Sequence, residues 1–443
     1  MKLSIRELIR ATGAEIIKGN PEYSEKVGIS TDTRTISKED IYLPLKGENF
    51  DGEKIIANSD LKMYFTSTGI INDSAEIVLK VEDTKEAYLK IANYYRKLVN
   101  PKTIGITGSS GKTTTKELVY SVLSKKFKTT KTFSNHNNEI GFCQTVLGME
   151  PETEVLIVEM GMRGLGEIEL ISKYLEPDYA IITNSGSAHI GRLGSLDNIA
   201  IAKCEIATGL NPDGIFIANN QDIIKKHIKY NGKKIYYSIC DVEILQKAPS
   251  YSKFKYDKQE YELNMEGDYN IENSLAAILL GINLGMSHDE ICKGLTSYHP
   301  IEKRWEIEEI GGNKYINDSY NANPESMKAS VKTFVELYNN PVVVLGNMGE
   351  LGENEKEYHQ EVGRFLSKLN KKVRYLTVGN LAREIGRELS DKGFEVQYFD
   401  SNEQVSCYIL ENLNESYTIF LKASRSMKFE QILENIKRGI IKL

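Results

Sequence analysis

The sequence lacks several features that define common classes of protein. Its five cysteines are scattered without paired spacing, which indicates neither a disulfide frame nor a cysteine metal site. It has no basic excess, and its formal net charge of −6 argues against a nucleic-acid-binding protein. No apolar run is long enough to span a bilayer, and residues 1–16 have the pattern of an amphipathic helix rather than of a signal peptide. These absences predict a cytoplasmic protein with reduced thiols and no membrane insertion.

What is present is an ordinary globular composition in a long chain. Hydrophobic residues make up 40% and charged residues 27% of the 443 residues. That length exceeds what one hydrophobic core supports, so several domains are expected. The first part of the chain carries short β-type runs and a helix, EAYLKIANYYRKLV, and ends at the natural break Asn100-Pro101.

Beyond this break, strands and helices alternate, which predicts a parallel sheet covered by helices on both faces. A hairpin-rich insert is expected from KKIYYSICDVEI to YELNMEG. Gly311-Gly312 marks the next joint, after which strands such as PVVVLG and YTIFLKA alternate with helices again. The sequence thus predicts an α/β fold with three domains, over residues 1–100, 101–311 and 312–443.

The stretch GITGSSGKTTTKE predicts a phosphate-binding loop between a strand and a helix. Its glycines are displaced, because Ile106 stands where the generic pattern has glycine. The backbone N–H groups of the loop are expected to surround phosphate oxygens, aided by the dipole of the following helix. Lys112 is expected against the β- and γ-phosphates, and the hydroxyl of Thr113 on Mg²⁺. The other predicted loop contacts are Gly108, Ser109, Gly111 and Thr114.

Three further side chains of this domain are candidates, each with a plain structural alternative. Glu159 ends the apolar run VLIVEMG, where an acid at the tip of a parallel strand can reach the metal, although a solvated loop glutamate gives the same pattern. His189 also follows a strand end, but a lone histidine is more often structural. Lys203, in NIAIAKCEIATGL, has the pattern of an exposed helix lysine.

A polar turn lies in the segment YINDSYNANPESMKAS. Asp318, Tyr320, Asn321 and Asn323 crowd between a strand and a helix, and Pro324 stands at the expected helix start. A binding site and an ordinary Asn- and Pro-rich turn fit this composition equally well.

Together these motifs resemble the Mur ligase family, ATP-dependent amide-bond-forming enzymes of peptidoglycan synthesis. TGSSGKTTT is similar to that family's own form of the phosphate loop, which accounts for the displaced glycines. FSNHNNEIG, EMGMRGLGEI, TNSGSAHIGRLGS, DSYNANPESM, LGNMGELG and LKASRSMKFE follow the order seen in family members that add D-alanyl-D-alanine. ISTDTRTI also resembles the first domain of those members, so the resemblance covers essentially the whole chain.

The resemblance implies a first domain that holds a uridine nucleotide, a central P-loop ATPase and a C-terminal Rossmann-like domain that closes over the site. It implies a monomeric ligase that adds D-alanyl-D-alanine to UDP-N-acetylmuramoyl-tripeptide, and so serves cell-wall biogenesis, cell shape and cell division. In that reaction the peptide carboxylate attacks the γ-phosphate of ATP, and the amine then attacks the resulting acyl phosphate. Two Mg²⁺ ions and a lysine would offset the charge repulsion between carboxylate and triphosphate.

The resemblance also implies roles for individual residues. Glu159 would bind Mg²⁺ between the phosphates, and His189 would help to hold the second Mg²⁺. Lys203 aligns with a carbamylated lysine, whose carbamate, formed from CO₂, would supply an oxygen ligand. With Lys112, these are the candidate catalytic residues. Further nucleotide contacts would come from Asn270, Asn273, Arg304 and Asp318. Substrate contacts would come from Ser30, Asp32, Arg34, Asn137, Asn138, Asn321, Ser424 and Arg425.

The sequence departs from the family pattern in places. Asn347 replaces an aspartate in LGNMGELG, and Ala423 replaces a glycine in LKASR. Gly191 and Arg192 stand where the family tends to have leucine and glutamate. None of these changes removes a predicted metal or phosphate ligand.

Two other functions remain open on the sequence. A divergent Mur-type ligase would join another amine to another carboxylate. A non-catalytic nucleotide-binding paralogue would sense or scaffold, but would have no need to combine Glu159, His189 and Lys203. A folate-type ligase would leave SYNANPESM and the N-terminal domain unexplained.

Overall fold

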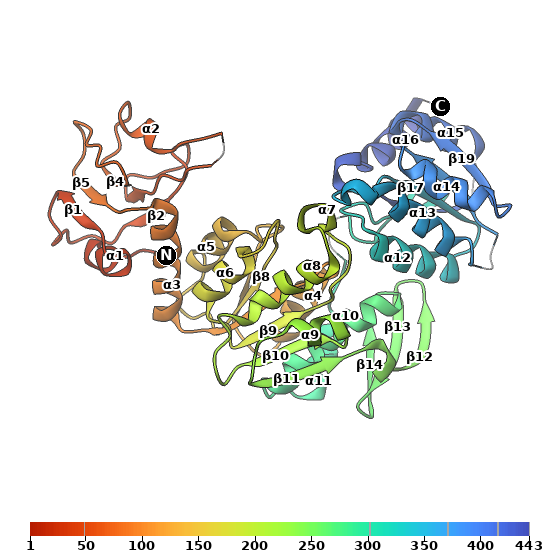
Figure 1. The fold of residues 1–443 in the computed structure, drawn as a ribbon, viewed down its shortest axis with the longest axis horizontal. Coiled ribbons are helices and arrows are strands. Elements are labelled where there is room, and N and C mark those ends of the chain that lie inside the picture. The colour runs from red at the N-terminus through yellow and green to blue at the C-terminus, as the bar shows by residue number, and fades with distance from the viewer. Residues whose placement is uncertain (48, 301–302, 370–371, 414–415, 443) are drawn as a thin grey trace.

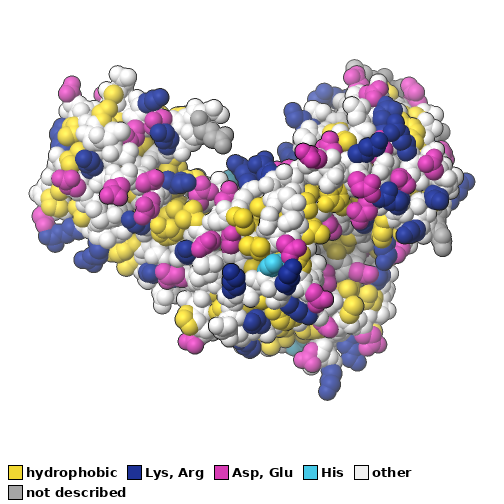
Figure 2. All heavy atoms as spheres, in the orientation of Figure 1, with side chains coloured by type: hydrophobic (Ala, Val, Ile, Leu, Met, Phe, Trp, Pro, Cys, Tyr) yellow, Lys and Arg dark blue, Asp and Glu magenta, His cyan; other side chains and the backbone are white. Residues whose placement is uncertain are grey.

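The computed structural model describes residues 1–47, 49–300, 303–369, 372–413 and 416–442. The chain forms three α/β domains, and Figure 1 shows the first and the third on either side of the central one. Figure 2 shows an open notch between these two outer domains, with acidic and basic side chains interleaved over the visible face. The α/β fold with three domains is therefore confirmed.

The N-terminal domain is built on a five-stranded sheet of order β1-β5-β4-β3-β2, in which only the β1–β5 pair is antiparallel. Its first helix is shorter than the predicted helix over residues 1–16, because Gly13 ends it at φ +73. The elements are α1 (Ile5–Thr12), β1 (Glu15–Lys18), β2 (Gly28–Ser30), β3 (Asp40–Tyr42), α2 (Glu53–Ile56), β4 (Met63–Thr66) and β5 (Ile77–Lys80).

Helix α3 (Thr84–Val99) joins the N-terminal domain to the central one. Asp83 caps its first turn, and Asn100 ends it in the left-handed conformation. The helix packs against α5 (Glu139–Leu147) and α6 (Glu167–Leu175) of the central domain (Figure 1). Its buried side chains belong to one apolar core that continues from the first domain into the second.

The central domain has a six-stranded parallel sheet of order β11-β10-β9-β6-β8-β7. Separate apolar cores lie on its two faces, as the alternation of strands and helices predicted. Because β6 lies between β8 and β9, the chain changes direction across the sheet here, and the carboxyl ends of these three strands form a switch point. The strands are β6 (Lys102–Thr107), β7 (Thr129–Lys131), β8 (Val155–Glu159), β9 (Tyr179–Ile182), β10 (Ile215–Asn219) and β11 (Lys233–Tyr237). The other helices are α4 (Lys112–Leu123), α7 (Ile190–Leu193), α8 (Leu196–Cys204), α9 (Asp222–His227), α10 (Asp268–Asn283) and α11 (His288–Thr296).

The antiparallel insert is smaller than predicted. The segment KKIYY forms β11, which pairs in parallel with β10 at the edge of the central sheet. The insert consists of β12 (Glu243–Ala248), β13 (Tyr251–Tyr256) and β14 (Gln259–Leu263). Because β11 is an edge strand, it is covered less completely than a central strand. Its sequence therefore mixes polar and apolar residues as a hairpin strand does, which explains why the sequence pattern predicts it as part of the insert.

The C-terminal domain has a six-stranded sheet of order β15-β16-β20-β17-β18-β19, parallel except for the β15–β16 pair. The predicted boundary at Gly311-Gly312 falls inside this sheet. Both glycines have positive φ, +59 and +78, and form the two-residue turn from β15 (Glu306–Ile310) to β16 (Asn313–Asn317). The remaining elements are α12 (Pro324–Leu337), β17 (Pro341–Gly346), α13 (Glu355–Leu366), β18 (Arg374–Val378), α14 (Ala382–Ser390), β19 (Glu395–Phe399), α15 (Asn402–Asn412), β20 (Thr418–Lys422) and α16 (Glu430–Lys442).

Two expectations about the whole chain can be compared with the structure. Within the described residues, no helix combines the length and the apolar character that crossing a bilayer requires. The five cysteines are all free thiols, as their spacing predicted.

Candidate active site

A cavity of about 1020 Å³ lies where the central and C-terminal domains meet. The phosphate loop, the ends of β8 and β9 and the segment 135–138 line it from the central domain, and the polar turn after β16 lines it from the C-terminal domain. The predicted site residues in its lining are Ser109, Gly111, Lys112, Thr113, Thr114, Asn137, Asn138, Glu159, His189, Asn273, Arg304, Asp318 and Asn321. The other predicted site residues are described but lie outside this lining: Gly108, Lys203, Asn270, Ser30, Asp32, Arg34, Ser424 and Arg425.

The unusual glycine spacing of the loop follows from its close neighbours. A Cβ at Gly108 would lie 1.9 Å from the hydroxyl of Thr183, and one at Gly111 would lie 2.5 Å from the side-chain oxygen of Asn273. Gly111 also adopts φ +76 directly before α4. The loop is therefore confined between the end of β9 and the start of α10.

The loop differs in one respect from the prediction that its N–H groups surround a phosphate. The N–H groups of Ser109 and Ser110 donate to the backbone oxygen and the side-chain oxygen of Asn184, at 3.0 and 2.9 Å. The first turn of α4, whose N–H groups have no partner within the helix, is thus the part of the loop best suited to a phosphate.

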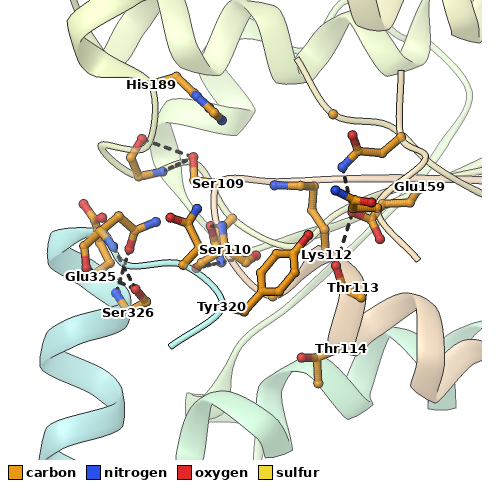
Figure 3. A pocket seen from close by; sticks show the side chains of 18 of the residues that line it. Ser109, Ser110, Lys112, Thr113, Thr114, Glu159, His189, Tyr320, Glu325 and Ser326 are labelled. Carbon is orange, nitrogen blue, oxygen red and sulfur yellow. Dashed lines mark hydrogen bonds between the residues drawn. The ribbon is translucent and has the colours of Figure 1, made fainter. Parts of the chain in front are cut away.

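Lys112 is the first residue of α4, and Figure 3 shows it beside Glu159. Its Nζ donates to the backbone oxygen of Gly108 at 2.7 Å. Burial lowers the pKa of Lys112, the charge of Glu159 acts in the opposite direction, and the charge of Arg304 lowers it further. The position fits a lysine that contacts the phosphates.

Glu159 is not the solvated loop residue that the sequence left open. It ends β8 with 2% of its surface exposed. Its Oε1 accepts from the hydroxyl of Thr113 at 3.2 Å and from the amide of Asn137 at 3.0 Å (Figure 3). Arg304 in turn donates to the hydroxyl of Thr113 at 3.0 Å. The structure thus joins four predicted site residues in one network.

His189 lies on the opposite side of Lys112 from Glu159 in Figure 3. It precedes α7 at φ +68, and its Nδ1 lies 2.5 Å from a carboxylate oxygen of Glu350 in the C-terminal domain. Among the described residues, no three His, Cys, Asp or Glu side chains gather closely enough to hold a metal ion. The metal site predicted from Thr113, Glu159, His189 and carbamylated Lys203 is not of this kind and stays a prediction.

Two departures from the family pattern are explained at this contact. A Cβ at Gly191 would lie 2.4 Å from the backbone nitrogen of Gly352, so the two domains approach here only because glycine is present. The guanidinium of Arg192 lies 3.4 Å from Glu350, the residue that also pairs with His189.

Lys203 is not the exposed helix lysine that its local sequence pattern indicated. Its side chain on α8 is completely buried, and its Nζ has no hydrogen-bond partner among the residues that the structure describes. Burial holds the pKa of Lys203 well below its ordinary value, and the charge of Lys112 lowers it further against the opposing charge of Glu205. Periodicity could not reveal this burial, because it depends on the packing of α8 against other elements.

The two asparagines predicted to contact the nucleotide lie in different surroundings. Asn273 lines the cavity, whereas Asn270 is buried and donates to the backbone oxygen of Glu266 at 2.7 Å. Arg304 lies 4.0 Å over the ring of Tyr320, which the sequence noted only as part of the polar turn.

The C-terminal domain contributes two residues that the sequence analysis missed. Lys422 is buried at the end of β20, and its Nζ lies 2.6 Å from the carboxylate of Asp318. Glu325, at the start of α12, accepts from the backbone N–H and the hydroxyl of Ser187 at 2.9 and 3.0 Å. The word LKASR could have identified Lys422, but no sequence signal links Glu325 to Ser187.

The predicted acceptor-side and uridine-side residues lie elsewhere. Ser424 is buried and Arg425 pairs with Glu430 at 2.9 Å, both in the C-terminal domain. In the N-terminal domain the guanidinium of Arg34 lies 2.6 Å from the carboxylate of Asp32, in an exposed pair beyond β2. The predicted roles of these residues stay predictions.

Comparison with known proteins agrees with this arrangement. Residues 106–281 match the Mur ligase middle domain, and residues 303–425 match the Mur ligase, glutamate ligase domain. The UDP-N-acetylmuramoyl-tripeptide--D-alanyl-D-alanine ligase of Bacillus subtilis (strain 168) is 35% identical over 445 residues, covering 96% of this chain and 97% of that protein. The protein of the same name from Synechocystis sp. is 32% identical, covering 92% of this chain and 91% of that protein. The crystal structure of MurF from Acinetobacter baumannii superposes with a TM-score of 0.88 at 28% identity, over 99% of both chains.

A phosphate-loop domain joined to a Rossmann-like domain across one cavity defines the class of ATP-dependent, amide-bond-forming ligases. The chain belongs to the Mur ligase family, as its motifs predicted.

Proposed function

We propose that this protein joins D-alanyl-D-alanine to the terminal carboxylate of UDP-N-acetylmuramoyl-tripeptide with consumption of ATP, the reaction that the names of its relatives state for them. The observation that carries the proposal is the shared cavity. It places the phosphate loop, the Asn137-Asn138 segment and the C-terminal polar turn around one space. A triphosphate, a carboxylate and an amine can therefore meet there.

The chemistry is an exchange of leaving groups. A carboxylate oxygen attacks the γ-phosphorus, the bond to the β-phosphate oxygen breaks, and ADP leaves. The amine nitrogen then attacks the carbonyl carbon, loses a proton, and expels phosphate. Lys112 and Arg304 supply the positive charge that lets two anions approach each other. Closure of the C-terminal domain across the cavity keeps water from the acyl phosphate.

Magnesium fits the residues present. Thr113 and Glu159 offer a hydroxyl and a carboxylate oxygen 3.2 Å apart beside Lys112, and both residues line the cavity. Hard oxygen ligands of this kind, completed by substrate phosphates and water, are what Mg²⁺ prefers. When bound, the ion neutralises phosphate charge. We propose His189 as a ligand of a second Mg²⁺.

We further propose that Lys203 is carbamylated. Only a neutral amine combines with CO₂, and the burial that lowers the pKa of Lys203 favours the neutral form of its Nζ. Loss of one proton then gives an anion, for which the nearby positive charge of Lys112 is favourable. The carbamate would provide an oxygen ligand beside His189 for the second Mg²⁺.

The remaining parts of the proposal concern partners and location. We propose that Ser30, Asp32 and Arg34 face the uridine nucleotide, and that Asn321, Ser424 and Arg425 face the acceptor or the peptide. The five free thiols fit a reducing compartment, so we place the enzyme in the cytoplasm. We also propose that it acts as a monomer.

Phosphate release tests the reaction directly. Purified protein with MgATP should release phosphate only when both UDP-N-acetylmuramoyl-tripeptide and D-alanyl-D-alanine are present. A panel of other UDP-muramoyl peptides, amino acids and dipeptides provides the comparison. Release with another amine, and none with D-alanyl-D-alanine, would favour the divergent ligase instead.

Lys203→Ala tests the proposed carbamate. Turnover should fall by at least about 100-fold, because the ligand set is incomplete, while ADP binding measured by calorimetry is retained. Added acetate or another short carboxylate should restore part of the activity. Lys173→Ala, which removes an exposed lysine of α6, is the control and should be neutral. Unchanged turnover in Lys203→Ala would remove this lysine from the site.

A further inference from the structure

Lys116, on α4 one turn after Lys112, is a buried lysine that lies behind the site. Its side chain is 0% exposed. Nζ donates to the backbone oxygen of Ser134 at 3.1 Å, and lies 3.2 Å from Oε1 of Glu117 and 3.6 Å from Oε2 of Glu159. A fully buried ammonium is rare and is retained only with paired charges. Neither the sequence motifs nor the proposed reaction assigns Lys116 a role.

The two carboxylate oxygens of Glu159 have different neighbours. Oε1 faces the hydroxyl of Thr113 and the amide of Asn137, both of which line the cavity. Within the described part of the chain, Oε2 accepts no hydrogen bond, and it lies on the side of Lys116. The ammonium therefore holds the carboxylate with one oxygen toward the cavity and the other away from it.

Lys116 contacts two carboxylates, and Lys112 is a further cation beside Glu159. Glu117, the second carboxylate at Lys116, also pairs with Lys131, whose Nζ lies 4.0 Å over the ring of Tyr120. Two carboxylates and two ammonium groups thus form one chain of ion pairs, from Lys131 near the surface to Glu159 at the cavity. A divalent cation alone is attracted only weakly by Glu159, because the charge of this carboxylate is already compensated. A cation bound to a triphosphate also has the negative phosphate oxygens as ligands.

Lys116 is also tied to the segment that carries Asn137. Ser134, whose carbonyl accepts from Lys116, has the unusual φ of +48. Three residues later Asn137 donates to Glu159. The same ammonium therefore fixes Glu159 and the backbone that presents one of its hydrogen-bond donors.

We propose that Lys116 is a positioning residue that presents Glu159 as a one-oxygen, charge-compensated ligand, so that the divalent cation enters with the nucleotide and not alone. The inference rests on the proposed function insofar as Glu159 faces Mg²⁺ there.

The test is the binding of Mn²⁺ in the absence of nucleotide. The electron paramagnetic resonance signal of the free ion measures this binding. Lys116→Met removes the charge and nearly keeps the length. The full-length variant should bind Mn²⁺ about tenfold more tightly than the wild type, because Glu159 loses the cation beside its Oε2 and keeps only Lys112. The wild type should reach a similar affinity only when ADP is added. A lysine with a merely structural role would leave Mn²⁺ affinity unchanged or lower it on removal.

Two further variants locate the effect. Lys131→Met removes the outer cation, which pairs with Glu117 and not with Glu159, and should leave Mn²⁺ affinity unchanged. Adding Glu159→Gln to Lys116→Met should abolish the tighter binding. If Lys116→Met does not fold, Lys116→Gln, which keeps a donor for Ser134, replaces it with the same expected result.

Unchanged or weaker Mn²⁺ binding in the Lys116 variants would overturn the inference, as would equal tightening in Lys131→Met. The measurement needs no acceptor and no sugar nucleotide. Its failure therefore leaves the phosphate-release result standing, and failure of that assay leaves the Mn²⁺ result standing.

Discussion

The two joints of the central domain are built differently. At the N-terminal joint, Tyr88 and Tyr95 of α3 are buried in the same apolar core as Phe142 and Val146 of α5. The hydroxyl of Tyr95 also donates to the backbone oxygen of Met149 at 2.9 Å. One continuous core thus spans the first joint.

At the C-terminal joint, polar contacts cross the cavity, and apolar packing among the described residues is limited to partly buried side chains such as Ile190 and Tyr269, which lie against the C-terminal core. Glu325 accepts two hydrogen bonds from Ser187, and Glu350 pairs with His189 and Arg192. Polar contacts exchange with water at little cost, so an interface of this kind can separate and form again. The first joint therefore holds the N-terminal and central domains at a fixed separation. The second joint, which borders the site, allows the C-terminal domain to move relative to the central one.

The largest expected effect is at the apolar joint. Tyr95→Ala should lower the free energy of unfolding by about 3–5 kcal/mol, since it leaves a cavity in the shared core. Tyr95→Phe, which loses only the hydrogen bond to Met149, should cost about 1 kcal/mol. Urea unfolding measures both. Equal losses in the two variants would mean that the ring contributes little, and that the joint is not held by apolar packing.

At the polar joint, Gly191→Val should act on turnover rather than on stability. Its Cβ would meet the backbone of Gly352 at 2.4 Å, so the two loops could not dock. Phosphate release should fall about 100-fold, because the two halves of the site are no longer held together. Small-angle X-ray scattering should show a larger radius of gyration. In the control, Gly164→Val, the new Cβ meets nothing within 4 Å, and an equal loss there would refute the docking explanation.

The smallest effect concerns an ion pair at the N-terminal joint. Burial raises the pKa of Glu176, but a hydrogen bond from Lys97 and the charges of Arg96 and Lys97 outweigh it, so the pKa lies below its ordinary value. The contribution to stability is therefore complete above the ordinary carboxyl range, near pH 4.3, and is lost as the pH falls through the lowered native pKa. Glu176→Gln should cost about 1 kcal/mol or less at pH 7.

Unfolding of Glu176→Gln measured between pH 7 and pH 3 should show its difference from the wild type shrinking toward acid. Glu86→Gln, in an exposed pair with Lys90 on the same helix, is the matched control. A difference that is constant across this pH range would show that the carboxylate charge is not what stabilises the joint.

The fold and the phosphate loop were predictable because their signals are local. Strand, glycine loop and helix follow one another within GITGSSGKTTTKE, and the carboxyl end of β8 placed Glu159 beside them. Parallel strands bring their carboxyl ends to one edge, so this part of the site could be assembled from the sequence.

Other features depend on contacts between distant segments. The burial of Lys203 and the pairing of His189 with Glu350 are set by tertiary packing, which leaves no trace in helical or strand periodicity. The Gly311-Gly312 pair looked like a joint because tight hairpins and linkers favour the same residues. Its role became clear only from the pairing of the strands on either side.

Helix α3 has a consequence for how the molecule comes apart. Because its buried side chains belong to a core shared by two domains, unfolding of either domain exposes part of the core of the other. The C-terminal domain has a core on each face of its sheet, and in the described part of the chain the central domain adds only partly buried side chains, Ile190 and Tyr269, to one of them. Three sheets should therefore behave as two cooperative units, and amide hydrogen exchange should report one opening free energy for the first two sheets and another for the third.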